Sequence, residues 1–266
     1  MSVNEKMTAI ADRLRLHTGT VDKLSLDEMV TEIDSVSMQM YLVFRDMEAF
    51  YGATLPDAFW DVLQIKGERR NYSQVFMGNL FTDATFKPKY NLIVTNAYRM
   101  FQSNIALTDL RKSNIGIDMD FSQCTDFSMA FGGMVSLKYI GDISTVGANE
   151  VYRSFMGCAV LEEVGTFTVK EETTFNNPFA QCRALTTITF AGTIGQDFTV
   201  PHSPLNRASI ESIVRCLSPV AEDKTLTLKS GIVNTAFETS SGASDGESAF
   251  LAFVDELGKD NWNISY

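Results

Sequence analysis

Between Phe127 and Ile188 the apolar residues recur at a fixed interval. Each copy of the pattern reads Phe-x-x-(Met/Cys)-x-x-Leu-x-x-(Ile/Val). The matching residues are Phe131, Met134, Leu137, Ile140, Phe155, Cys158, Leu161, Val164, Phe179, Cys182, Leu185 and Ile188. A fixed period between roughly 20 and 50 residues is typical of proteins built from stacked repeats. One copy cannot bury its own apolar row, so we expect at least three copies to stack on one another.

Two weaker copies precede these three. The first keeps three of the apolar positions at the same offsets, at Phe101, Leu107 and Leu110. The interval from Phe101 to Phe131 is longer than the regular one, and we place the extra residues at 111–120. The second copy is looser and is marked by Phe76, Met77 and Leu80. Degraded outer copies are typical of the end of a stack, so the pattern predicts about five copies of about 24 residues over residues 71–200.

Each copy is expected to contain one short strand, from its Leu to the following Ile or Val. The stretch 185–190 is rich in β-branched residues, as strands are. Residues between these two apolar positions should point outward, and stacking would place like positions side by side. The outward residues are Ser136, Lys138, Tyr139, Glu162, Glu163, Thr186 and Thr187. They differ from copy to copy, which indicates either unconstrained exposed positions or a face that binds a partner. Gly141 and Gly165 follow the expected strands and should permit a tight turn.

The residues before the copies fall into two parts. Residues 1–36 predict two short amphipathic helices, one over 2–17 and one from Ser25, each opened by a Ser with a Glu three residues later. Two short helices make a poor core, so we expect them to dock on a partner or on a second copy of the chain. Residues 37–70 are dense in Met and aromatic residues and predict a helix interrupted near Gly52 and Pro56. We interpret them as a cap over the first copy, with a partner-binding groove as the alternative.

Residues 201–266 are expected to close the other end of the stack. The pattern predicts a helix over 206–217, a strand over 224–229, a helix over 244–257 and a final strand over 261–266.

Three stretches carry a resemblance to a known family. Near the N-terminus stand Met7-Thr-Ala-Ile-Ala-Asp-Arg-Leu-Arg, His17-Thr-Gly-Thr and Lys23-Leu-Ser-Leu-Asp-Glu-Met, followed by Ile33. They resemble the N-terminal module of minor tail and tail-fibre-like proteins in phages and prophages of Gram-positive bacteria. The Phe-x-x-Cys and Leu-x-x-Ile elements resemble BspA-like leucine-rich repeats of bacterial surface and phage tail proteins. The helix–strand–helix–strand order at the C-terminus is similar to the terminal cap of the same phage proteins.

This resemblance implies an α+β solenoid of leucine-rich repeats with an N-terminal helical module and a C-terminal α/β cap. It implies that residues 1–36 contact other phage tail proteins, with a homo-oligomer as an open alternative. It further implies that the repeats meet a bacterial cell-surface glycan or protein. Lys138, Tyr139, Glu162, Glu163, Thr186 and Thr187 are then the candidate partner face.

Composition limits the partners and the location. The chain has 266 residues, 45% of them apolar, and a net charge of −11. Nucleic acid and anionic membrane surfaces are poor partners for such a chain, because phosphate groups are bound by clustered Lys and Arg. The polar N-terminus lacks the apolar core of a signal peptide, and no apolar run is long enough for membrane insertion. We expect a protein made in the cytoplasm without a signal peptide and placed in a virion tail or on a cell surface.

Candidate catalytic chemistry is sparse. The chain has no Gly-x-Ser-x-Gly, Walker or His-Glu-x-x-His motif, and its two histidines, His17 and His202, lie far apart in sequence. Its four cysteines have no Cys-x-x-Cys spacing, and Cys158 and Cys182 are expected to stack as buried thiols rather than to form a disulfide or a metal site. We therefore expect no cofactor and no enzymatic activity.

One metal hypothesis arises from the sequence. Asp118 and Asp120 would share one face of a strand, and together with Asp109 they could bind a hard cation such as calcium.

Three functions are consistent with these features. The first is a non-enzymatic phage or prophage tail protein that displays a leucine-rich repeat surface for recognition of the host cell envelope or for tail assembly. The second is a purely structural spacer of the tail or baseplate. The third is a bacterial surface adhesin that binds a host glycoprotein.

Overall fold

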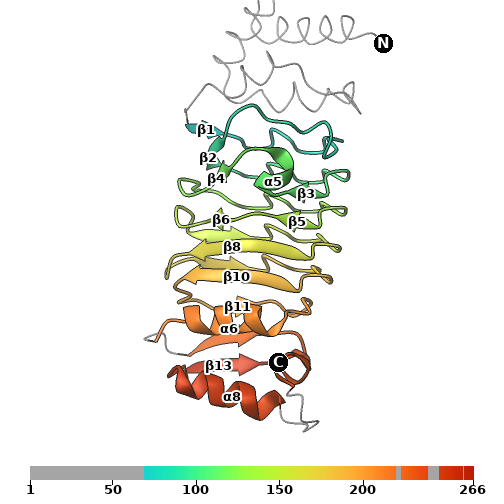
Figure 1. Cartoon of the computed structure of the whole chain (residues 1–266). Helices are drawn as coiled ribbons and strands as arrows, with labels where there is room; N and C mark the ends of the chain where they lie inside the picture. The colour runs from blue at the N-terminus through green and yellow to red at the C-terminus, as the bar shows by residue number, and fades with distance from the viewer. Residues whose placement is uncertain (1–68, 220–222, 239–245, 260) are drawn as a thin grey trace, which may run out of the picture.

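The computed structural model describes residues 69–219, 223–238, 246–259 and 261–266 (Figure 1). The helices expected in residues 1–36 lie outside the described residues, as does nearly all of the apolar stretch at 37–70.

One strand ladder carries the residues that were expected to point outward. Its strand order is β10-β8-β5-β3, and β6 pairs with the second half of β8. The strands are β3 (Asp109–Leu110), β5 (Tyr139–Ile140), β6 (Ile143–Ser144), β8 (Glu163–Val169) and β10 (Thr187–Gly192). β3, β5, β8 and β10 begin two positions after the Leu of the pattern and not at it, so the expected strand starts were too early. Figure 1 shows the strands lying one above the other in chain order.

Register partners in this ladder follow the period of the sequence. Thr187, Glu163 and Tyr139 are paired, and they are spaced along the chain as the phenylalanines of the pattern are. Asp109 is separated from its partner Tyr139 by the longer interval. The extra residues include a short helix, α5 (Lys112–Ile115), inside the predicted insertion at 111–120.

The other strands between Arg69 and Asn176 form two smaller sheets. One contains β1 (Arg69–Asn71), β2 (Leu92–Asn96) and β4 (Met119–Asp120), and the other is the pair of β7 (Glu150–Tyr152) and β9 (Thr174–Asn176). Every pairing between strands in the described part of the chain is parallel.

A column of phenylalanine rings runs through the core. Phe76, Phe101, Phe131, Phe155 and Phe179 are all fully buried. Successive ring centroids are 5.0, 5.6, 5.1 and 5.1 Å apart, and the last three pairs are within 10° of parallel. Such offset-stacked pairs contribute about 0.5–1.5 kcal/mol each beyond their burial. The two weak copies, which begin at Phe76 and Phe101, thus continue the column of the three strong ones.

Each stacked phenylalanine lies between two residues in the left-handed backbone region, two positions before it and two after it. These residues are Gln74, Gly78, Arg99, Ser103, Met129, Gly133, Arg153, Gly157, Asn177 and Gln181. Left-handed backbone costs about 1–2 kcal/mol for a residue with a side chain. The same conformation directs backbone N–H groups at the next copy: the amides of Phe131 and Phe155 donate to Ser154 O and Pro178 O, both at 2.8 Å. These hydrogen bonds between copies offset the backbone cost.

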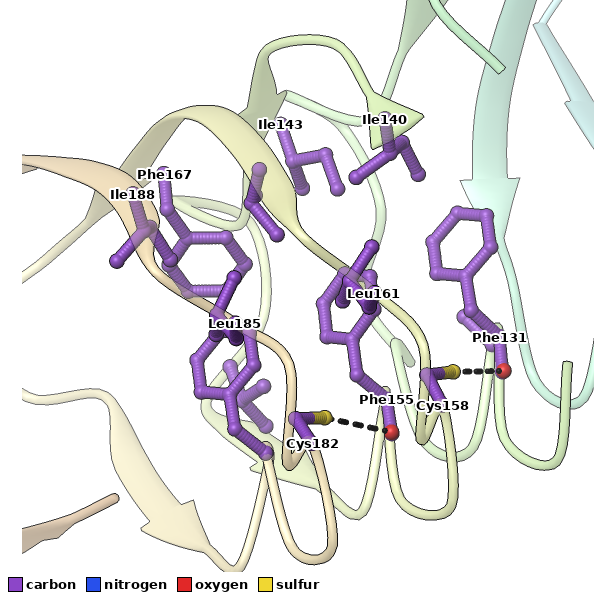
Figure 2. Packing of buried hydrophobic residues seen from close by; sticks show 14 of the residues in the cluster. Phe131, Ile140, Ile143, Phe155, Cys158, Leu161, Phe167, Cys182, Leu185 and Ile188 are labelled. Atoms are coloured by element: carbon purple, nitrogen blue, oxygen red, sulfur yellow. Dashed lines mark hydrogen bonds between the residues drawn. The ribbon is translucent and has the colours of Figure 1, made fainter. Parts of the chain in front are cut away.

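The cysteine expectation is confirmed. All four cysteines are free, and Cys158 and Cys182 are fully buried. Their thiols donate to the carbonyl oxygens of Phe131 and Phe155, one copy earlier, at 3.1 and 3.2 Å (Figure 2). A small side chain with a weak donor therefore fits this position of the pattern.

The C-terminal elements follow the predicted order, with one addition. They are α6 (Arg207–Cys216), β12 (Lys224–Thr227), α7 (Ile232–Phe237), α8 (Gly246–Glu256) and β13 (Trp262–Ser265), and β11 (Phe198–Thr199) precedes them. The predicted helices and strands are α6, β12, α8 and β13, and α7 was not predicted. β11, β12 and β13 form a parallel sheet.

Helix α6 covers the open edge of β10. The backbone amides of Ile188 and Phe190 donate to the hydroxyls of Ser209 and Ser212 on this helix, at 3.0 and 3.1 Å. A parallel ladder that ended without such a cover would expose unpaired amides to other chains.

Candidate functional site

The six predicted partner-face residues lie side by side on three neighbouring strands. Tyr139, Glu163 and Thr187 are register partners across β5, β8 and β10, and the residue before each of them is Lys138, Glu162 or Thr186. All six side chains are exposed or half-buried. Asp109 continues the row on β3, and Arg111 follows it. We call these eight residues the ladder face: Asp109, Arg111, Lys138, Tyr139, Glu162, Glu163, Thr186 and Thr187.

Glu162 connects two residues of the neighbouring strand. The hydroxyl of Tyr139 donates to Glu162 Oε2 at 2.8 Å, and the Lys138 ammonium lies 3.6 Å from Glu162 Oε1. The hydrogen bond to Glu162 raises the pKa of Tyr139, because ionisation of the phenol would place two negative charges side by side. Tyr139 therefore presents a neutral hydroxyl and an aromatic ring at neutral pH.

Arg111 lies at the centre of the ladder face. Its guanidinium lies over the ring of Tyr139, 4.2 Å from the centroid. It binds Asp109 through two nitrogens, with Nε 3.0 Å from Oδ1 and Nη2 2.7 Å from Oδ2, and Nη1 lies 3.8 Å from Glu163 Oε2. The hydrogen bond to Asp109 raises the pKa of Arg111. Arg111 was not predicted from the sequence. Asp109 aligns with Tyr139 only when the longer interval between Phe101 and Phe131 is taken into account.

A groove of about 600 Å³ adjoins the ladder face. It lies where the ladder breaks between β5 and β6 and where the chain leaves β3 toward α5. Six charged residues contribute to its lining: Arg111, Lys112, Asp118, Asp120, Asp142 and Glu163. Arg111 and Glu163 belong to both the groove and the ladder face, so one partner could contact both.

Gly141 and Gly165 also line the groove. Gly165 does not follow a strand, as the sequence suggested, but lies inside β8. A Cβ there would stand 2.6 Å from Asp142 Oδ1 and 2.8 Å from the carbonyl carbon of Gly141, so the two segments approach too closely for a side chain. At Gly141 the nearest atom to an added Cβ is the Cα of Arg111, at 3.9 Å.

The aspartates of the calcium hypothesis are each engaged elsewhere. Asp109 binds Arg111, Asp118 lies 2.6 Å from the Lys112 ammonium, and Asp120 accepts from the backbone amide of Ser122 at 2.8 Å. Within the described ranges, no three His, Cys, Asp or Glu side chains are arranged to hold a metal ion. The structure therefore does not bring the three carboxylates of the calcium hypothesis together in a metal-binding group.

The remaining candidates for chemistry are also accounted for. His202 is exposed in the turn after Val200, and His17 lies outside the described residues. Burial raises the pKa of the Cys158 thiol to about 12 and that of Cys124 to about 11. Thiols with such pKa values stay protonated at neutral pH and are poor nucleophiles.

Comparison with protein-family models, with curated proteins and with solved structures gave no match. Among the described residues, no helix is both long enough and apolar enough to cross a membrane.

Proposed function

We propose that this chain is a leucine-rich-repeat-type solenoid that acts without catalysis, as a phage or prophage tail protein whose ladder face recognises the envelope of a Gram-positive host. The tail assignment follows from the resemblance of residues 1–36, which would attach the protein to other tail proteins. The protein would then be displayed on a virion tail, with the cell surface as the alternative location.

The observation that carries the recognition role is the composition of the ladder face. It brings an aromatic ring, a guanidinium, an ammonium, three carboxylates and two threonine hydroxyls onto four adjacent strands. Tyr and Arg are enriched where proteins bind their partners, since both combine large contact area with polar ends. A stack of parallel strands also supplies a broad surface for non-covalent contacts.

A second function, that of a structural spacer, is favoured by a different observation. The charged side chains of the ladder face already pair with one another, as in the contacts of Glu162 and Arg111. A face whose groups are satisfied internally needs no partner. Such exposed pairs contribute only about 0–1 kcal/mol each, however, so a partner with better geometry can displace them.

Whole-cell binding distinguishes these two functions. The labelled full chain is measured by flow cytometry on a panel of Gram-positive bacteria, beside the triple variant Tyr139→Ala, Glu162→Ala and Glu163→Ala. The matched control is Glu150→Ala with Glu172→Ala, which removes two exposed carboxylates outside the ladder face. Saturable binding to some strains, kept by the control and lost by the triple variant, supports recognition by the ladder face. No binding to any strain favours the spacer. Equal binding by all three proteins contradicts recognition by the ladder face, because another surface then binds the cells.

A further inference from the structure

A second surface lies on the turns that precede the stacked phenylalanines. In every copy, the two residues three and two positions before the ring occupy one column of the molecule. From copy to copy they are Ser73–Gln74, Tyr98–Arg99, Ser128–Met129, Tyr152–Arg153 and Asn176–Asn177. The second residue of each pair has left-handed backbone, with φ between 49° and 60°. We call these ten residues the turn column.

Backbone hydrogen bonds hold the turn column in register. The amides of Arg99, Met129 and Arg153 donate to Ser128 O, Tyr152 O and Asn176 O at 2.9, 2.8 and 2.9 Å. Tyr98–Arg99 and Tyr152–Arg153 therefore lie two layers apart in the same column. With a strand spacing of about 4.8 Å, the two pairs are separated by roughly 10 Å.

The two Tyr–Arg pairs have the same internal geometry. The Arg99 guanidinium lies 4.9 Å from the centroid of the Tyr98 ring, and that of Arg153 lies 5.0 Å from the centroid of Tyr152. All four side chains are half-buried, so each retains exposed surface. The ring holds the guanidinium in place and limits the side-chain entropy that a bound partner would otherwise remove.

The charge of the turn column is unusual for this chain. The protein has a net charge of −11, yet none of the ten positions is acidic. Arg111 and Arg207 each bind a carboxylate, whereas neither Arg99 nor Arg153 forms an ion pair with any residue in the part of the chain that the structure describes. A guanidinium that has no carboxylate partner can form two parallel hydrogen bonds to an external anionic group.

We propose that the turn column binds an anionic polysaccharide, with one acidic group at Arg99 and a second at Arg153. The two arginines are separated by roughly 10 Å, so an extended polysaccharide that carries an acidic group on each sugar can reach both of them. The exposed parts of Tyr98 and Tyr152 supply ring and hydroxyl contacts for the sugars between them. This surface is distinct from the ladder face, and the proposal stands or falls independently of the recognition role of that face.

The test measures binding of polygalacturonate to the full chain by calorimetry at low salt. The variant is Arg99→Asn with Arg153→Asn, because Asn177 occupies the same left-handed position in this chain and shows that Asn fits there. The matched control is Arg183→Gln with Lys229→Gln, which removes two exposed positive charges outside the turn column. We expect the double Asn variant to bind about a hundredfold more weakly, since each of its two lost charge-assisted contacts is worth about a factor of ten. The control should bind like the wild type.

Two control polymers and two single variants complete the test. Uncharged dextran should not bind, and polyglutamate should bind more weakly than polygalacturonate because it offers no sugar to the tyrosines. Single substitutions of Arg99 and Arg153 should each cost part of the affinity. Absence of polygalacturonate binding overturns the proposal, as does an equal loss in the control or equal binding of polyglutamate. Circular dichroism and thermal unfolding establish that every compared variant is folded.

Discussion

Gly165 illustrates how one residue fixes the shape of the groove. Its missing side chain lets β8 approach the backbone of Gly141, and a Cβ there would overlap Gly141 and Asp142 at 2.8 and 2.6 Å. We predict that Gly165→Ala lowers the free energy of unfolding by about 1–3 kcal/mol, because the segment of Gly141 and Asp142 must shift. Gly141→Ala, whose Cβ meets no atom closer than 3.9 Å, should change it by less than about 0.5 kcal/mol. Urea unfolding of the two variants checks this, and equal values would contradict the close approach.

The buried thiols predict a specific dependence of stability on pH. Burial raises the pKa of Cys158 to about 12, above its ordinary value of 9.0. The folded state thus keeps the thiol protonated at pH values where the unfolded chain has lost the proton. This contribution to stability is fully present below pH 9.0 and is lost as the pH rises toward about 12.

We therefore expect the wild type to lose more stability than Cys158→Ala between neutral pH and about pH 10.5. The measurement is the free energy of unfolding of both proteins by urea at each pH. The alanine variant lacks the thiol, so its other losses serve as the reference. Identical slopes for the two proteins would show that Cys158 is not buried as a protonated thiol.

At the scale of the element, the column of stacked rings joins one copy to the next. Phe155 packs between Phe131 and Phe179 with both centroids at 5.1 Å. We predict that Phe155→Ala lowers the free energy of unfolding by about 3–5 kcal/mol, since it leaves a cavity in the middle of the column. Phe155→Leu, which keeps most of the volume, should cost less. Guanidinium unfolding measures both, and a cost below about 1 kcal/mol for the alanine variant would refute the role of the column.

Among the elements, the regular copies were the part of the fold that the sequence predicted best. The strict interval from Phe131 to Phe155 to Phe179 predicted which residues are buried and which six lie together on the ladder face. The copy that begins at Phe101 was harder to predict, because the positions of α5 and Arg111 in its insertion do not follow from the repeat pattern. As a result the groove and the Asp109–Arg111 pair emerged only from the fold.

Other features lacked a usable sequence signal. Helix α7 begins after Gly231, which has left-handed backbone and no side-chain cap, so the usual start of a helix is missing. The three aspartates at 109, 118 and 120 suggested a metal site because their positions in sequence do not show that Arg111 and Lys112 bind two of them. The two Tyr–Arg pairs are recognised as equivalent only when Phe101 and Phe155 are known to stack in one column.

For the molecule as a whole, we propose two binding surfaces on one stack of parallel strands. The ladder face combines carboxylates, cations and one aromatic ring, and we propose that it contacts the host envelope. The turn column has no acidic residue, and we propose that it binds an anionic polysaccharide. Two surfaces on one stack can engage a composite target at the same time, which would raise the overall affinity without any new contact.

The most direct test of the central proposal is carboxyl footprinting of the full wild-type chain on a bacterial strain that it binds. A water-soluble carbodiimide modifies exposed carboxylates in the free and the cell-bound protein, and mass spectrometry reads each position. The account predicts that Glu162 and Glu163 become protected on binding, while the exposed Glu150 and Glu172 remain as reactive as before. Unchanged reactivity of Glu162 and Glu163 in the bound protein would contradict recognition by the ladder face.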